Sequence, residues 1–131
     1  MKKILFFLVL ISAVIGCQMK SYHPAEFFII NKTDEPIIIL SSALVRQTDV
    51  HTNEGYIEKS IKDVLEPQKS LSLRRISVSD SVQISDVFTN LEVYKNKVKA
   101  TIDLMNTDLW EKSIDTDGKI NYTISIEPTA F

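Results

Sequence analysis

Hydrophobic and polar residues alternate along several short segments of this 131-residue chain, which is the pattern of strands with one buried face. Residues 98–104 show it most clearly, with the apolar side chains Val98, Ala100, Ile102 and Leu104 expected to face the core. Residues 120–126 repeat it, with four apolar residues alternating with polar ones. Both segments are predicted to be one-sided antiparallel strands.

Two segments near the start of the domain are apolar on successive residues. Residues 26–31 and 36–45 are rich in Phe, Ile and Val, and the polar residues 32–35 between them are typical of a turn. They predict two strands joined by a short connection and covered on both faces at their centres.

Residues 57–65 allow two interpretations. Their apolar residues Ile57, Ile61, Val64 and Leu65 have helical spacing, but the same stretch can form a strand that Pro67 ends. We favour the strand, because residues 66–69 have turn chemistry and residues 70–74 alternate, with Leu71 and Leu73 inward. A short helix is the alternative.

Short alternations at residues 82–84 and 91–93 predict two more strands. A two-residue loop at Lys95-Asn96 would place Val93 opposite Val98. A slip by one residue would set apolar side chains against charged ones, so the hydrophobic pattern requires a loop of even length.

Two polar stretches predict loops, residues 47–55 and residues 106–117. The second ends at a tight-turn signal, Asp117-Gly118, and contains Trp110. A lone tryptophan in a small domain either fills the core or forms an exposed partner contact. Both interpretations of Trp110 stay open.

About seven short strands with little helix predict an all-β fold for residues 26–131, an antiparallel immunoglobulin-like β-sandwich. A cleaved segment is predicted before it. Lys2 and Lys3 precede a run of apolar residues over 4–15 that is interrupted only by Ser12. The run is shorter than the roughly 20 residues that span a bilayer, so residues 1–16 are predicted to be an export signal peptide.

The end of this signal, Val14, Ile15, Gly16 and Cys17, resembles the lipobox of bacterial lipoproteins. The resemblance implies cleavage between Gly16 and Cys17, a diacylglyceryl group on the Cys17 sulfur, and further acylation such as palmitate on the new amino terminus. Two or more acyl chains make a stable membrane anchor, whereas one chain binds reversibly. The alternative is an ordinary secretory signal in which Cys17 is incidental.

Residues 17–25 are predicted to hold the lipid and a short polar tether. The seven residues 18–24 span at most about 25 Å when extended, which places the domain near the membrane surface. In lipoproteins an Asp after the cysteine often marks retention at the inner membrane, and this chain has Gln18 instead. The resemblance therefore implies a bacterial cell-envelope location at the outer membrane, on its periplasmic or surface face.

Composition excludes several classes of function. Removal of residues 1–16 leaves 131 − 16 = 115 residues, enough for one domain, with no cysteine pair for a disulfide and no cysteines for a zinc cluster or a thiol nucleophile. Loss of Lys2 and Lys3 leaves 15 − 2 = 13 basic against 17 acidic residues, or −4, which does not favour nucleic acid. Three glycines provide no phosphate-binding loop.

No catalytic constellation is evident, so no catalytic residue, metal or cofactor is predicted. His23 is assigned to the tether, and His51 lies beside Asp49 in a predicted loop. Asp117-Gly118 resembles part of a calcium loop, but the EF-hand spacing puts Ile124 at the bidentate acid position. A looser cation site on Asp108, Asp115 and Asp117 is the alternative to a charged turn.

Arg74-Arg75 interrupts the alternation begun by Leu71 and Leu73, so one arginine should point to each face. The pair is typical of an edge strand, where charge discourages pairing with other sheets. The alternative makes Arg74 a contact for an anionic partner.

These observations predict a membrane-anchored, non-enzymatic sandwich that binds a protein or glycan partner or has a structural role. The arrangement resembles small single-domain bacterial lipoproteins with an immunoglobulin-like sandwich, a family to which no function is assigned. The alternative is a periplasmic inhibitor or immunity protein that neutralises a cell-wall hydrolase or toxin. Residues 47–55 and 106–117 would then supply the loops that enter the enzyme's cleft.

Overall fold

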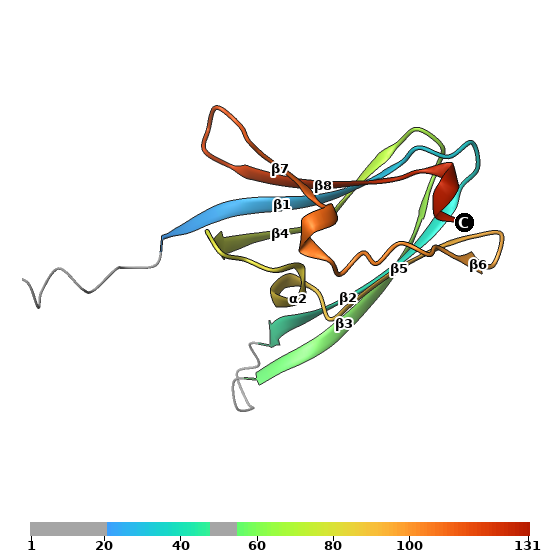
Figure 1. The fold of residues 1–131 in the computed structure, drawn as a ribbon. Helices are drawn as coiled ribbons and strands as arrows, with labels where there is room; N and C mark the ends of the chain where they lie inside the picture. The colour runs from blue at the N-terminus through green and yellow to red at the C-terminus, as the bar shows by residue number, and fades with distance from the viewer. Residues whose placement is uncertain (1–20, 48–54) are drawn as a thin grey trace, which may run out of the picture.

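The computed structural model describes residues 21–47 and 55–131, which form two packed four-stranded sheets (Figure 1). The first sheet has the order β4 (Ser70–Ser79), β1 (Tyr22–Asn31), β8 (Ile120–Ile126) and β7 (Glu111–Ile114). The second has the order β3 (Gly55–Leu65), β2 (Ile37–Gln47), β5 (Asn90–Lys95) and β6 (Val98–Lys99). The prediction of an all-β sandwich is therefore confirmed, with eight described strands.

The strand β8 shows the predicted alternation, since Ile120, Tyr122, Ile124 and Ile126 are all buried. It pairs antiparallel with β7, as expected, but parallel with β1 on its other side. The parallel pairing arises because β1 and β8 both begin at the same end of the sandwich. The antiparallel partner of β1 is β4 instead.

Phe27 of β1 lies at the centre of the core and is fully buried. Its ring stacks on Tyr122 with centroids 4.8 Å apart and makes edge contacts with Phe88 at 5.7 Å and Trp110 at 6.1 Å. Trp110 is only 6% exposed, and its indole N–H donates to the carbonyl oxygen of Leu104 at 2.8 Å. Trp110 is thus a core residue, and its interpretation as an exposed partner contact is wrong.

The segment with two interpretations is a strand, as favoured. β3 pairs with β2 over its whole length, from Gly55 opposite Gln47 to Leu65 opposite Ile37. Of the apolar residues with helical spacing, only Leu65 is buried. A helix would therefore have lacked a buried face and would have left β2 without this neighbour.

The predicted strand at residues 98–104 is mostly wrong, because only β6 at its start pairs with β5. The Ala100 N–H still donates to the Val93 carbonyl at 2.8 Å, but the Thr101 N–H donates to the carbonyl of Ala130 at 2.7 Å. The backbone thus leaves the sheet and follows the C-terminal 3-10 helix η2 (Pro128–Ala130). Ala100 and Leu104 are buried all the same, which explains the misleading alternation.

The β5–β6 hairpin has a two-residue loop, which confirms the predicted even length. The loop is Asn96-Lys97, one position later than predicted, and both residues have positive φ, 48° and 68°. Lys95 therefore lies opposite Val98. Asparagine tolerates this left-handed conformation better than Lys95 would, which places the turn at Asn96.

Two other local predictions are wrong. Residues 82–84 do not form a strand, because the short helix α2 (Ile84–Val87) begins there and buries Ile84 and Val87 on the same side. The Asp86 carboxylate caps it by accepting the backbone N–H of Gln83 at 2.8 Å. Residues 106–117 are not only a loop, since they contain the 3-10 helix η1 (Thr107–Leu109) and β7.

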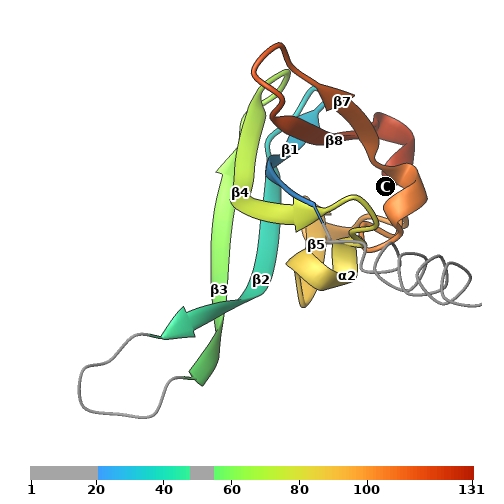
Figure 2. The same cartoon turned by 90° about the vertical axis from the view of Figure 1, so that its left-hand side faces the viewer.

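The second sheet has a projecting part that we call the arm, made of residues 43–47 of β2 and 55–59 of β3. Residues 38–42 of β2 pair with β5 as well as β3, whereas residues 43–47 pair with β3 alone. Figure 2 shows these paired ends leaving the body of the sandwich.

Candidate functional site

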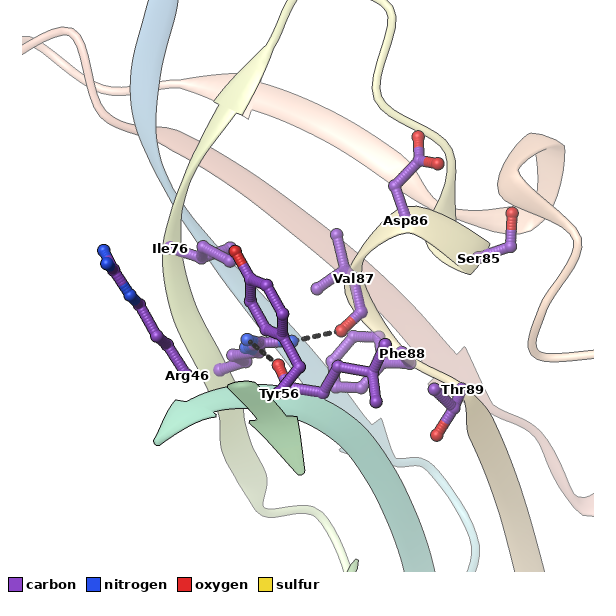
Figure 3. Close-up of a pocket in the computed structure, with 10 residues that line it drawn as sticks. Arg46, Tyr56, Ile76, Ser85, Asp86, Val87, Phe88 and Thr89 are labelled. Carbon is purple, nitrogen blue, oxygen red and sulfur yellow. Dashed lines mark hydrogen bonds between the residues drawn. The ribbon is translucent and has the colours of Figure 1, made fainter. Parts of the chain in front are cut away.

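A pocket of about 400 Å³ lies where the arm meets the rest of the sandwich. The arm contributes Leu44, Arg46 and Tyr56, β4 contributes Arg74 and Ile76, and the chain from α2 into β5 contributes residues 85–89 (Figure 3). The volume lies in the range typical of small-ligand pockets.

The pocket exists because β5 begins at Asn90, directly after α2. The Thr89 N–H donates to the carbonyl of Ser42 at 2.8 Å, and the sheet hydrogen bonds between β2 and β5 end there. Beyond Ser42 this side of β2 faces α2 across a gap. A strand edge without a neighbouring strand leaves backbone groups that other donors must satisfy.

Arg74 supplies one such donor from the opposite sheet. Its guanidinium donates to the carbonyl oxygen of Leu44 at 3.0 Å and also to the carbonyl oxygen of Val87 at the end of α2. Arg74 thus ties together β4, the arm and α2, and it fixes the width of the pocket.

The electrostatics of Arg74 are unusual for an arginine. Burial lowers the pKa of its guanidinium, because removal from water disfavours the charged form. In the described part of the chain its hydrogen-bond partners are two backbone carbonyls, and it forms no ion pair with a carboxylate. The pocket wall therefore carries a half-buried positive charge that acceptor groups of a partner could approach.

A β-bulge explains how Arg74 reaches this position. The pairing of β1 with β4 shifts between Phe27, opposite Arg74, and Phe28, opposite Ser72, which leaves Leu73 as the extra residue. Leu73 and Arg74 consequently both point to the inner side of the sheet. Arg75 points to the outer face, so the prediction of one arginine on each face is confirmed, as is the edge position of β4.

Exposed apolar side chains surround the pocket. Leu44 is 50% and Tyr56 72% exposed, both on the arm. A second hollow of about 170 Å³ lies on the inner side of the arm between Ala43, Ile61 and Leu73. Arg74 and Phe88 line both hollows. Grouped apolar exposure of this kind is typical of a contact surface.

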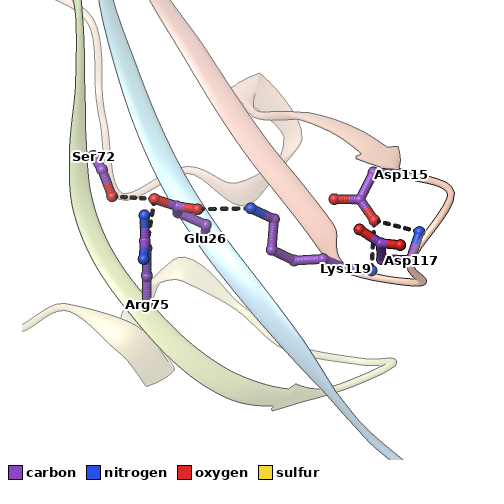
Figure 4. A network of polar contacts seen from close by, with 6 residues as sticks. All are labelled: Glu26, Ser72, Arg75, Asp115, Asp117 and Lys119. Carbon is purple, nitrogen blue, oxygen red and sulfur yellow. Dashed lines mark hydrogen bonds and ion pairs between the residues drawn. The ribbon is translucent and has the colours of Figure 1, made fainter.

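The outer face of the first sheet holds a polar cluster centred on Glu26, which is only 2% exposed. Its carboxylate accepts hydrogen bonds from Ser72 at 2.7 Å, Arg75 at 2.8 Å and Lys119 at 2.9 Å (Figure 4). These partners lower the pKa of Glu26 to about 2, with the Ser72 hydrogen bond the largest cause. A carboxylate so fully bonded stays ionised and has a structural role.

The alternative cation site on Asp108, Asp115 and Asp117 is not formed. The Asp115 carboxylate instead accepts the backbone N–H groups of Asp117 at 3.0 Å and Lys119 at 2.9 Å, which closes the predicted tight turn at Gly118 (Figure 4). Within residues 21–47 and 55–131, no three His, Cys, Asp or Glu side chains are placed to hold a metal ion.

The structure corrects the place of His23. It lies in β1 opposite Val78, and its imidazole Nε2 is 3.1 Å from the Asp80 carboxylate, so it belongs to the sandwich. His51, Gly16 and Cys17 lie outside the described residues.

Sequence reasoning singled out Arg74 but missed Leu44, Tyr56 and Phe88. One signal was available, since the apolar positions of β4 change phase between Leu71/Leu73 and Ile76/Val78, which marks the bulge that turns Arg74 inward. The other residues come from three separate elements, and only the tertiary structure brings them together.

Comparisons of the chain with protein-family models, with curated protein sequences and with solved structures found no match. Among the residues that the structure describes, no helix has both the length and the apolar character needed to cross a bilayer.

Proposed function

We propose that this chain is a lipid-anchored, non-enzymatic binding protein of the bacterial cell envelope, held by Cys17, which contacts a protein partner through the arm and the pocket at its base. The observation that supports a binding role is the pocket itself, with exposed Leu44 and Tyr56 at its rim and Arg74 in its wall.

The chemistry of this surface favours a protein over a glycan. Leu44, Ile76, Val87 and Phe88 give the pocket an apolar lining suited to an aliphatic or aromatic side chain. Tyr56 offers contact area at low entropic cost, and Arg74 can meet a carbonyl or carboxylate of the partner. Polar residues also line the pocket, but the exposed apolar rim of Leu44 and Tyr56 favours a protein surface over a sugar.

An inhibitor or immunity protein is the second candidate, and the shape of the arm favours it. The paired residues 43–47 and 55–59 extend beyond β5, so they can enter the cleft of an enzyme. The other predicted inhibitory loop is a weaker candidate, since part of residues 106–117 is paired into the first sheet as β7.

The binding role is tested by photo-crosslinking in intact cells. A photoreactive phenylalanine analogue replaces Tyr56, and a matched protein carries it at Val98, which is 54% exposed on β6 at the opposite end. We expect a discrete crosslinked protein from position 56 and none from position 98. An identified hydrolase would favour the inhibitor, and identical patterns from both positions would contradict the proposed site.

The anchor is tested separately with Cys17→Ala. The parent protein should incorporate labelled palmitate, carry the mass of its acyl chains and sediment with membranes, because several chains give stable anchoring. The variant should lose the label. A parent protein that washes off membranes unmodified would refute the anchoring.

A further inference from the structure

We infer that one end of the sandwich lies against the bilayer, with Tyr22 and Ile114 as its contacts in the headgroup region. We call it the tether end, because β1 begins there. The inference rests on the acylation of Cys17, which belongs to the proposed function, and goes on to name the surface that touches lipid.

The length of the tether limits how far this end can lie from the membrane. β1 begins at Tyr22, four residues before the predicted strand at Glu26, so residues 18–21 alone separate it from Cys17. Five Cα steps span at most about 18 Å at roughly 3.5 Å per residue. The first residue of the sandwich is thus held within that distance of the lipid anchor.

The strand pairings show what else lies at the tether end. Tyr22 is opposite Ser79 at the end of β4, and the parallel pairing of Ala25 with Ile120 places the start of β8 nearby. The β7–β8 turn, which follows Ile114, is therefore at this end as well.

Two highly exposed hydrophobic residues lie at this end. Tyr22 is 66% and Ile114 65% exposed, at the first position of β1 and the last position of β7. A tyrosine ring with an apolar body and a polar hydroxyl suits the boundary between headgroups and acyl chains. The two strand tips lie close enough together to touch one flat surface at once, as a bilayer offers.

The charge at the tether end supports contact through apolar side chains rather than through attraction to anionic lipid. Lys119 is already bonded to Glu26, and His23 to Asp80. Asp115 and Asp117 lie in the adjacent turn. Because acidic and basic groups are mixed, we expect the contact to form on neutral phosphatidylcholine and to change little with anionic lipid.

The test uses the full acylated protein in phosphatidylcholine vesicles, with an environment-sensitive fluorophore on one introduced cysteine. Ile114→Cys and Val98→Cys form a matched pair, since both replace exposed aliphatic residues on short edge strands at opposite ends. Cys17 is the one native cysteine and would be blocked by its lipid. We expect a blue shift, and loss of emission with brominated lipid, at position 114 and neither at position 98.

The outcomes separate this inference from the proposed function. Equal emission at the two positions, in protein that sediments with vesicles, would overturn the orientation and leave the anchor intact. Protein that carries no acyl chains and does not sediment would refute the anchor itself. Tyr22→Asp should reduce the blue shift at position 114, since it places a charge in the contact, and an unchanged spectrum would contradict the role of Tyr22.

Discussion

The guanidinium of Arg74 lies 3.0 Å from the carbonyl oxygen of Leu44, and this hydrogen bond joins the edge strand of the first sheet to the arm of the second. The same guanidinium bonds the last carbonyl of α2 at Val87. One side chain thus positions the arm, the helix and the pocket between them. The pocket width and the mobility of the arm should both depend on it.

Arg74→Lys tests this role against Arg75→Lys, the same change one residue away. A lysine ammonium is a single point of charge and cannot bond two separated carbonyls in the geometry of the guanidinium fork. We expect a loss of about 1–2 kcal/mol in the free energy of unfolding, typical of hydrogen bonds made by a charged group. Amides of residues 43–45 and 87–89 should exchange hydrogen faster.

Arg75 is 79% exposed and makes one ion pair with Glu26, which lysine can retain, so Arg75→Lys should leave both measurements nearly unchanged. Equal exchange rates in the two variants would show that Arg74 does not hold the arm.

The Glu26 cluster predicts how stability changes with pH. Its pKa falls from 4.5 to about 2 on folding, so the folded state holds the ionised form more strongly than the unfolded chain does. The resulting stabilisation is complete above the unfolded pKa of 4.5 and is lost as the pH falls towards 2. Denaturant unfolding at a series of pH values should show this decline.

Glu26→Gln provides the control for that decline. It should lower the free energy of unfolding at neutral pH by about 1–2 kcal/mol, a modest amount because the two cations of the cluster reach solvent. It should also flatten the pH dependence between the two pKa values. An unchanged slope in this variant would assign the acid sensitivity to other carboxylates.

The hydrophobic pattern predicted those elements in which one face is buried throughout. β8 is the clearest case, because each of its inward residues is buried and each neighbour is partly exposed. The pattern wrongly predicted a strand at residues 98–104. There Ala100 and Leu104 are buried, although they belong to a segment without regular strand pairing. Alternate burial records which side chains face the core, and it does not require the backbone between them to pair in a sheet.

The candidate site could be predicted only in part. The charge of Arg74 inside an alternating segment marked it as unusual, but its acceptors are the backbone carbonyls of Leu44 and Val87, which carry no signature in the sequence. The pocket also depends on where β5 begins, since that point determines where β2 loses a neighbour. Such a boundary is set by tertiary hydrogen bonds, here the one from Thr89 to Ser42.

The core makes a prediction that is independent of the site. Phe27 is fully buried among three aromatic rings, whereas Phe28 next to it faces outward and is half-buried. Phe27→Ala should lower the free energy of unfolding by about 3–5 kcal/mol, the usual result of removing a core ring. Phe28→Ala should lower it by much less. The emission of Trp110 reports unfolding, and similar losses in both variants would contradict this position of the core.

Two substitutions in turns, one that introduces a glycine and one that removes a glycine, should change the free energy of unfolding in opposite directions. Lys97 has a φ of 68° in a two-residue hairpin loop, where Asn-Gly is the preferred pair, so Lys97→Gly should raise the free energy of unfolding by about 0.5–1 kcal/mol. Gly118 has a φ of 79° with open space around its missing Cβ, so Gly118→Ala should lower it by about 1 kcal/mol through backbone strain alone. Denaturant midpoints at constant slope would measure both changes. Because both positions lie in turns outside the core and the arm, partner crosslinking from position 56 should stay the same in both variants. A loss of crosslinking in either variant would mean that these turns shape the contact surface.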